Sequence, residues 1–238
     1  MRIAMWSGPR NLSTAMMYAY GNRPDFDVID EPFYAAYLVK TGLNHPMRDE
    51  IIASQPTDPA QVVERLIGSN RGKKPHFYQK HMTQHMVPGM PRGWMAQVKN
   101  VFLLRHPARV IASFSAKYEN LTLDDIGFVQ QSDLYDDVLG LGAVPIVIDS
   151  SDIRQNPERQ LRKLCSALDL DWNPAMLRWP RGGHAKDGAW APHWYGAVHK
   201  STGFAGPEGA LPNLSGHLAE LTEQAMPHYE RLLSQKLD

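Results

Sequence analysis

Five short apolar segments alternate with segments of helical pattern, and this alternation constrains the fold more than any other feature. The apolar segments run over Ile3–Trp6, Phe26–Ile29, His76–Gln79, Val98–Leu104 and Val144–Ile148. Strands that alternate with helices pair in parallel, because each connecting helix returns the chain across one face of the sheet. The sequence therefore predicts an α/β fold with three layers, in which a central parallel sheet lies between two layers of helices.

Two of the helices have recognisable starts, each a capping residue followed by proline. Asp58-Pro59 precedes an apolar helical pattern that ends at Gly68, and Asn156-Pro157 precedes a second one. Aspartate or asparagine at the cap and proline at the first helical position are typical of a helix N-terminus. The second helix carries Cys165, the only cysteine, on its apolar face, so we expect this thiol to be buried in the core rather than to react.

The bulk properties favour one domain over residues 1–238. The 25 Lys and Arg residues balance the 25 Asp and Glu residues, which argues against a nucleic-acid surface. We see no signal peptide, no apolar run of the ~20 residues that span a membrane and no possible internal disulfide, so we expect a cytoplasmic protein without a membrane partner. The irregular segment at about 180–216 is rich in aromatic residues, which favours a functional role over disorder.

The first strand leads into the sequence SGPRNLST, which has the composition of a phosphate-binding loop. A turn at Gly8-Pro9 and a helix that begins near Asn11 direct free backbone N–H groups at one point. Arg10 adds a cation inside the turn, and Ser13 and Thr14 add hydroxyls in the first helical turn. The alternative is an ordinary strand-to-helix connection in which Asn11 caps the helix.

A second stretch, VFLLRHPARVIASFS, places an arginine and a serine at a later strand-to-helix junction. Arg105 ends the strand, and Ser113 follows eight residues later in the next helix. Both lie at the carboxyl edge of the sheet, where open α/β folds bind ligands, so together they can grip one phosphate. The alternative is that Arg105 is a solvated charge at a strand end.

Together these stretches resemble the nucleotide-binding elements of sulfotransferases that use 3'-phosphoadenosine 5'-phosphosulfate (PAPS), which have a fold like that of the P-loop NTPases. The resemblance implies that Gly8, Arg10, Asn11, Ser13 and Thr14 hold the 5'-phosphosulfate. It implies that Arg105 and Ser113 hold the 3'-phosphate. Lys200, in HKSTGF, stands about where a late basic loop of the family returns to the 3'-phosphate, although the family's motif is not reproduced there.

Three further stretches agree in order with the family, and the resemblance covers roughly residues 1–170. VIDEPFY contains the pair Glu31-Pro32, FYQKHM contains Lys80-His81, and VPIVIDSSDIRQNPERQLRKLCSALDL resembles the strand, turn and capped helix that follow. The first loop departs from the Lys-Ser-Gly-Thr-Thr of many cytosolic members, because Leu12 stands where glycine would. Arg10 is nearer the carbohydrate-type pattern.

The resemblance implies transfer of a sulfuryl group from PAPS to an acceptor hydroxyl or amine, without a metal. Arg10 would stabilise the leaving phosphate, and a general base would take the acceptor's proton. Glu31 and His81 are the residues suited to that role, with His85 as a competitor. We favour Glu31 as base, held extended by Pro32, and His81 as a positioning hydrogen-bond donor. The structural alternatives are a surface or capping carboxylate for Glu31 and a core histidine for His81.

Two other functions stay open at this stage, as do the acceptor and the oligomeric state. An ATP-dependent P-loop phosphotransferase would use Asp30, at the end of VIDE, as a magnesium ligand. Leu12 and Ser13, however, stand where the Gly-Lys pair of such a loop would be. A protein that binds the nucleotide without transferring anything is the non-enzymatic alternative.

Overall fold

The protein is described here from a computed structural model that covers residues 1–68 and 74–238. Five strands form one sheet, namely β1 (Arg2–Ser7), β2 (Phe26–Asp30), β3 (His76–Met82), β4 (Lys99–Leu104) and β5 (Ile146–Asp149). The α-helices are α1 (Ser13–Gly21), α2 (Tyr34–Thr41), α3 (Arg48–Ser54), α4 (Pro59–Ile67), α5 (Pro107–Ser115), α6 (Leu123–Ile126), α7 (Phe128–Gly140), α8 (Ser150–Gln155), α9 (Pro157–Ala167), α10 (Ala191–Trp194), α11 (Gly196–His199) and α12 (His217–Leu233). Three short 3₁₀ helices are η1 (Thr83–His85), η2 (Gly93–Gln97) and η3 (Pro174–Leu177). No helix in the described part of the chain has the length and apolar character needed to cross a bilayer.

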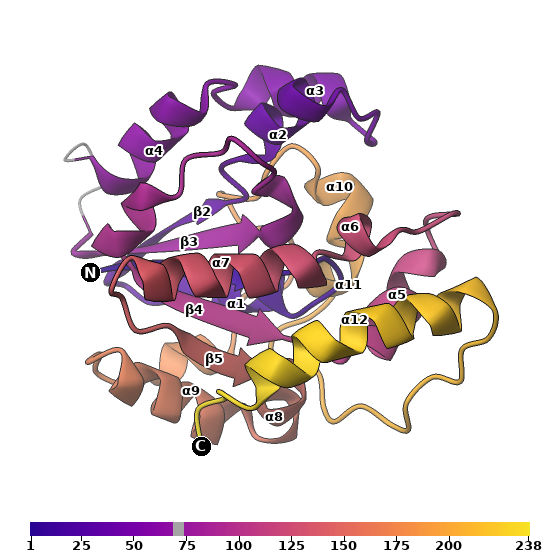
Figure 1. The fold of residues 1–238 in the computed structure, drawn as a ribbon. Helices are drawn as coiled ribbons and strands as arrows, with labels where there is room; N and C mark the ends of the chain where they lie inside the picture. Colours follow the sequence, from indigo (N-terminus) through magenta and orange to yellow (C-terminus); the bar gives the residue numbers. More distant parts are fainter. Residues whose placement is uncertain (69–73) are drawn as a thin grey trace.

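The sheet is entirely parallel, with the strand order β2-β3-β1-β4-β5, and helices cover both of its faces (Figure 1). The α/β fold with a central parallel sheet that the sequence predicts is therefore confirmed. In a parallel sheet all strands end at the same edge, so the loops after β1, β2, β3 and β4 gather there. That edge carries every residue of the site described below.

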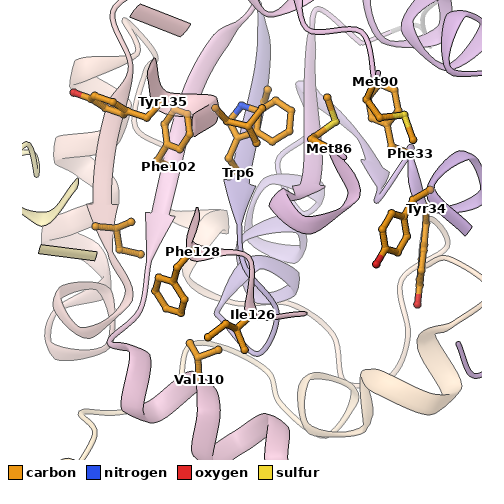
Figure 2. Close-up of a cluster of buried hydrophobic side chains, with 14 of the residues drawn as sticks. Trp6, Phe33, Tyr34, Met86, Met90, Phe102, Val110, Ile126, Phe128 and Tyr135 are labelled. Atoms are coloured by element: carbon orange, nitrogen blue, oxygen red, sulfur yellow. The ribbon is translucent and has the colours of Figure 1, made fainter. Parts of the chain in front are cut away.

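Side chains alternate between two apolar clusters, one on each face of the sheet. Ala4 and Trp6 of β1 belong to the larger cluster, whereas Ile3 and Met5 belong to the other, as the two-residue period of a strand requires. Figure 2 shows part of the larger cluster, where Phe102 of the sheet lies beside the aromatic ring of Tyr135 from α7. The smaller cluster packs α1 and α9 against the opposite face and contains buried Cys165, as expected.

The five predicted strands and the two helices with proline starts are confirmed, with small differences at their ends. The last strand was predicted to begin at Val144 but begins at Ile146. Pro145 has no N–H to donate to the sheet, and Val144 is 85% exposed. Asp58 accepts a hydrogen bond from Ala60 N, and Asn156 accepts one from Arg159 N, so both residues cap their helices.

The irregular segment at about 180–216 packs onto the domain through its aromatic residues. It contains only the short helices α10 and α11. Trp190 and Tyr195 are buried, and Trp194 is half-buried. The segment therefore belongs to the folded structure and brings side chains from late in the sequence to the carboxyl edge of the sheet.

Candidate active site

The loop between β1 and α1 is fixed to the neighbouring strand β4. The side-chain amide of Asn11 donates to the Leu103 carbonyl at 2.9 Å, and the guanidinium of Arg105 donates to the Arg10 carbonyl. The side-chain oxygen Oδ1 of Asn11 accepts from Leu12 N at 2.7 Å, just before the helix, which begins at Ser13 with no side-chain cap. Asn11 therefore ties the loop to the sheet rather than capping α1.

Gly8 supports this loop through packing. A Cβ atom at this position would lie 2.6 Å from the Ile126 carbonyl oxygen, so any larger residue would push the loop away from α6.

A cavity of about 350 Å³ opens at the carboxyl edge of the sheet. Most of the predicted site residues line it together, namely Arg10, Asn11, Ser13, Thr14, Glu31, Arg105 and Ser113. As the described residues define it, the lining does not include Gly8, His81 or Lys200. Lys200 is exposed at the end of α11. The fold thus brings the two predicted phosphate-binding stretches and one carboxylate into a single space.

The first end of the cavity, here called the cationic end, consists of Arg10, Asn11, Ser13, Arg105 and Ser113. Arg10 Nε donates to Ser113 Oγ at 3.0 Å, which joins the two predicted phosphate-binding stretches directly. Burial, together with the nearby charge of Arg105, lowers the pKa of Arg10. Two arginines held this close together favour an anion between them.

Glu31 meets a buried lysine at the centre of the cavity. Lys80 Nζ lies 2.7 Å from Glu31 Oε1 and 2.9 Å from Asp30 Oδ1, and its side chain is 1% exposed. Asp30 and Lys80 are direct partners across β2 and β3, so the sheet register itself creates this contact. The sequence motif contained Lys80, but nothing in the sequence alone indicated the carboxylates it would pair with.

Tyr195, from the late irregular segment, completes this buried network. Its hydroxyl donates to Asp30 Oδ2 at 2.7 Å and accepts from Lys80 Nζ at 2.5 Å and from Trp190 Nε1 at 2.8 Å. Gly188 N also donates to Asp30 Oδ2, at 3.1 Å. Both oxygens of Asp30 therefore accept bonds from protein donors, which favours a role as ion-pair partner over that of an open magnesium ligand. Among the described residues, no three His, Cys, Asp or Glu side chains gather as metal ligands would.

For each of Glu31 and Lys80, burial and neighbouring charges shift the pKa in opposite directions. Burial raises the pKa of Glu31, and the nearby Lys80 ammonium only partly offsets this effect. Burial lowers the pKa of Lys80, but the Asp30 and Glu31 carboxylates outweigh it and leave that pKa raised. Lys80 is thus a permanent cation beside a carboxyl group that is more basic than usual.

Arg10 and Glu31 share an uncommon backbone conformation. Their φ angles are +54° and +39°, in the left-handed region that residues with a side chain rarely adopt. The expectation that Pro32 holds Glu31 extended was wrong. Glu31 N donates to Lys80 O at 2.9 Å and Glu31 O accepts from Tyr34 N at 3.0 Å, and these bonds hold the residue in a turn. Such conformations cost about 1–3 kcal/mol and often mark functional sites.

The second end of the cavity, here called the aromatic end, is formed by rings from four parts of the chain. They are Tyr34, Tyr37, His45, His85, Phe114, Tyr118 and Trp194. The His85 ring stacks on Tyr34 at 4.4 Å and on Tyr37 at 4.8 Å between ring centres. Tyr118 stacks on Trp194 at 6.0 Å. These flat apolar surfaces suit a ligand with a flat face of its own.

His85 connects the aromatic end to Glu31. Its Nε2 lies 3.9 Å from Glu31 Oε2, and its Nδ1 is buried with no hydrogen-bond partner among the described residues. Burial, with the charges of His45 and Lys80, holds the pKa of His85 well below its usual value. The ring is therefore neutral, and it lines the cavity with its Nδ1 unpartnered among the described residues.

His81 occupies a different environment, in the core beneath the sheet edge. Its ring stacks on Trp6 at 4.4 Å, its Nε2 lies 3.2 Å from Gln79 Oε1, and burial lowers its pKa to about 3. Adjacent residues of a strand face opposite sides, so Lys80 and His81 cannot both face the cavity. Of His81 and His85, the two histidines considered as bases beside Glu31 from the sequence, only His85 lines the cavity.

Comparison with known proteins now adds to this geometry. The family model described as the sulfotransferase domain matches residues 1–236. Two Arabidopsis thaliana proteins, named branched-chain-amino-acid aminotransferase-like protein 2 and protein 1, are 36% and 35% identical over 97% and 98% of this chain. The chain spans 41% of the length of each of these relatives, so their names describe much longer proteins.

Solved structures share the fold. A sulfotransferase from Alicyclobacillus acidocaldarius has a TM-score of 0.60 at 13% identity and covers 98% of this chain and 94% of its own. The sulfotransferase domain of the Synechococcus PCC 7002 olefin synthase has a TM-score of 0.56 at 17% identity over 97% of this chain and 94% of its own. The sulfotransferase domain of the curacin biosynthetic pathway has a TM-score of 0.51 at 16% identity, over 99% and 98%.

Proposed function

Because this chain belongs to the sulfotransferase domain family, we propose that it transfers a sulfuryl group from PAPS to the hydroxyl or amine of a small molecule or carbohydrate. One observation carries the proposal. A single cavity joins the Arg10–Thr14 loop, the Arg105–Ser113 pair and the Glu31 carboxylate. Sulfuryl transfer needs three elements: hydrogen-bond donors that stabilise the leaving phosphate, residues that bind the nucleotide, and a base that takes the proton of the acceptor.

The reaction breaks the bond between sulfur and the bridging oxygen of PAPS and forms a bond from sulfur to the acceptor oxygen or nitrogen. The acceptor loses a proton, and 3'-phosphoadenosine 5'-phosphate (PAP) leaves with the electron pair of the broken bond. Negative charge therefore grows on the bridging oxygen. Arg10 and the N-terminal end of α1 would stabilise that charge, which is consistent with their shared position on the cavity wall.

Glu31 would take the acceptor's proton. Its raised pKa makes it a stronger base than an ordinary carboxylate, and its position beside Lys80 keeps a cation next to it throughout. His85 would orient the acceptor through its unpartnered nitrogen. In this proposal His81 has no direct contact with substrate, since it stacks on Trp6 in the core.

The aromatic end would bind the acceptor. Stacked rings favour a flat apolar face, which both a phenol and a sugar ring present. The carboxylates that line this end are Glu31 and Asp125. An acceptor that carries its own negative charge in the cavity would be repelled by both, so we propose an uncharged or amine-bearing acceptor.

Thermal unfolding with added nucleotides tests the donor. PAP at roughly a hundredfold excess over its dissociation constant should add about 2.7 kcal/mol of stability, which raises the melting temperature by about 5–10 °C at this chain length. Magnesium-ATP lacks the 3'-phosphate and should give a clearly smaller shift. Equal shifts from both nucleotides would contradict PAPS as the donor and favour the phosphotransferase. PAP binding without turnover of any acceptor in a screen with labelled PAPS would favour the non-catalytic alternative.

A further inference from the structure

A buried carboxylate lies among three arginines just beyond the cationic end of the cavity. Glu208 Oε1 lies 2.5 Å from Arg105 Nη2 and 2.8 Å from Arg154 Nη1, and Glu208 Oε2 lies 3.4 Å from Arg109 Nε. The Glu208 side chain is 8% exposed, and the three arginine side chains are 16–20% exposed. This group of four residues is here called the arginine cluster.

The arginines come from two junctions that the fold brings side by side. Arg105 directly follows β4, Arg109 lies in the first turn of α5, and Arg154 lies in α8 after β5. Because β4 and β5 are adjacent and parallel, the segments that follow them meet at the same edge. Glu208 lies in the long connection before α12 and is remote in sequence from all three.

Two of the same arginines also bind the backbone on either side of Glu208. Arg154 Nε donates to the Gly206 carbonyl at 2.8 Å, and Arg109 donates to the Gly209 carbonyl. Gly203 and Ala205, a few residues earlier, line the cavity itself. The arginine cluster therefore adjoins the cavity, with Arg105 common to both.

The charges in the cluster do not balance. Three guanidinium groups face one carboxylate, and no other carboxylate forms an ion pair with these arginines among the described residues. Burial raises the pKa of Glu208, but the bonds and charges of the three arginines outweigh it and lower that pKa. Glu208 Oε2 also has no hydrogen-bond partner in the described chain, so the carboxylate itself is not fully bonded in this position. A dianionic phosphate monoester offers more charge and three acceptor oxygens.

We infer that Arg105, Arg109 and Arg154 form a binding site for a phosphate monoester, and that Glu208 occupies this site until such a ligand displaces it. The inference rests on the proposed function in one respect, because the 3'-phosphate of PAP is the phosphate monoester that Arg105 would bring to the site. Arg109 and Arg154 then bind the 3'-phosphate of the nucleotide in addition to the Arg105–Ser113 pair. Glu208 competes with the phosphate for the three arginines and so lowers the affinity of the protein for PAP.

The test measures binding by titration calorimetry with PAP, with adenosine 5'-monophosphate, which lacks the 3'-phosphate, and with inorganic phosphate. The variants are Glu208→Gln, Arg154→Ala and, as a charge-matched control, Glu223→Gln, since Glu223 is exposed on α12. Glu208→Gln removes the competing charge and should tighten PAP binding about 5- to 50-fold, with adenosine 5'-monophosphate changed less than about twofold. Arg154→Ala should weaken PAP binding about 5- to 20-fold. Glu223→Gln should leave all three ligands unchanged.

The outcomes separate this inference from the proposed function. If wild type, Glu208→Gln and Arg154→Ala bind PAP equally, the inference fails and the PAPS proposal stands. If Glu208→Gln binds PAP more weakly, Glu208 is a clamp that positions the arginines, and the inference is overturned. If no variant binds PAP but Glu208→Gln gains inorganic phosphate binding, the arginine cluster stands and PAPS as donor fails. Circular dichroism checks the fold of each variant, and Arg154→Ala keeps the test decisive should Glu208→Gln unfold.

Discussion

The two ends of the cavity are built by opposite means. At the cationic end, polar and charged side chains of the loop after β1 form hydrogen bonds to neighbouring elements. Arg10 bonds to Ser113 in α5, and Asn11 bonds to the Leu103 carbonyl in β4. At the aromatic end, neutral rings hold one another by stacking, as His85 does against Tyr34 and Tyr37. A charged, directional surface selects a ligand by the positions of its oxygens, whereas a stacked surface selects only a flat shape.

Glu31 and Lys80 stand where the two ends meet. Lys80 is fully engaged by Asp30, Glu31 and the hydroxyl of Tyr195, so it contributes charge without needing to move. His85 reaches the same carboxylate from the aromatic side, at 3.9 Å. If the cationic end binds the donor and the aromatic end binds the acceptor, as proposed, mutations should change the two affinities separately, and changes at Glu31 should affect the transfer step alone.

Replacement of Glu31 should have the largest effect. Glu31→Gln keeps the shape of the side chain but removes the base, so turnover should fall about 10²- to 10⁴-fold while PAP affinity changes little. In the wild type, kcat should decrease as pH is lowered through the Glu31 pKa, because protonation removes the base. Since burial raises this pKa, the decrease should begin above the ordinary carboxyl range.

The same measurement on Glu223→Gln, an exposed glutamate on α12, gives the control and should match the wild type. A Glu31→Gln variant with turnover within a few-fold of wild type, and with an unchanged pH profile, would remove Glu31 from the reaction. The boundary between the two ends would then carry only a structural ion pair.

The sequence predicted the cationic end much better than the aromatic end. Arg10, Asn11, Arg105 and Ser113 lie within two continuous stretches, each a strand followed at once by a helix, so local pattern and resemblance suffice to bring them together. The five strands followed from the same local signals. What local signals cannot supply is the conformation of Glu31, because the bonds that hold its φ at +39° include one from Lys80 on another strand.

The aromatic end depends on contacts between residues far apart in the chain. Tyr34 and Trp194 are separated by 160 positions, and Tyr195 reaches Asp30 across a separation of 165. The irregular segment was expected to be functional because of its aromatic residues, but nothing in its sequence indicated which ring would reach the carboxylates. One available signal was missed, since the two-residue period of a strand sets Lys80 and His81 on opposite faces.

Arg105 tests whether the cationic end binds the nucleotide by its 3'-phosphate. Arg105→Ala should weaken PAP binding about 10- to 150-fold, the equivalent of about 1.5–3 kcal/mol for hydrogen bonds to a charged group. Adenosine 5'-phosphosulfate, which lacks the 3'-phosphate, should lose little affinity in titration calorimetry. Arg105 also donates to the Arg10 carbonyl. Equal losses with both nucleotides would therefore mean that Arg105 acts by holding the loop.

Two buried histidines offer a matched pair for the aromatic end. His85→Phe preserves the stack on Tyr34 and Tyr37 but removes the unpartnered Nδ1 proposed to orient the acceptor, so kcat/KM for the acceptor should fall about 10-fold. His81→Phe preserves the stack on Trp6 and should leave kcat/KM within about twofold. PAP affinity should be unchanged in both. If His81→Phe abolished turnover and His85→Phe did not, His81 would regain the role that the sequence first suggested.

Replacement of Asp125 should have the smallest effect and should affect only one kind of acceptor, because Asp125 is the partly exposed carboxylate at the aromatic end. Its Oδ2 accepts from Thr122 N at 2.8 Å in the capping box of α6, whose N-cap is Thr122. The amide oxygen of asparagine can accept the same bond, so Asp125→Asn should keep the fold. Removal of one partly solvated charge should raise the KM of an amine-bearing acceptor about 2- to 5-fold and leave that of an uncharged acceptor unchanged. The measurement compares the two acceptors in wild type and Asp125→Asn at saturating PAPS. A lower KM for the amine in the variant, or an equal rise for both acceptors, would contradict a charge-selective aromatic end and leave flat shape as its only basis for selection.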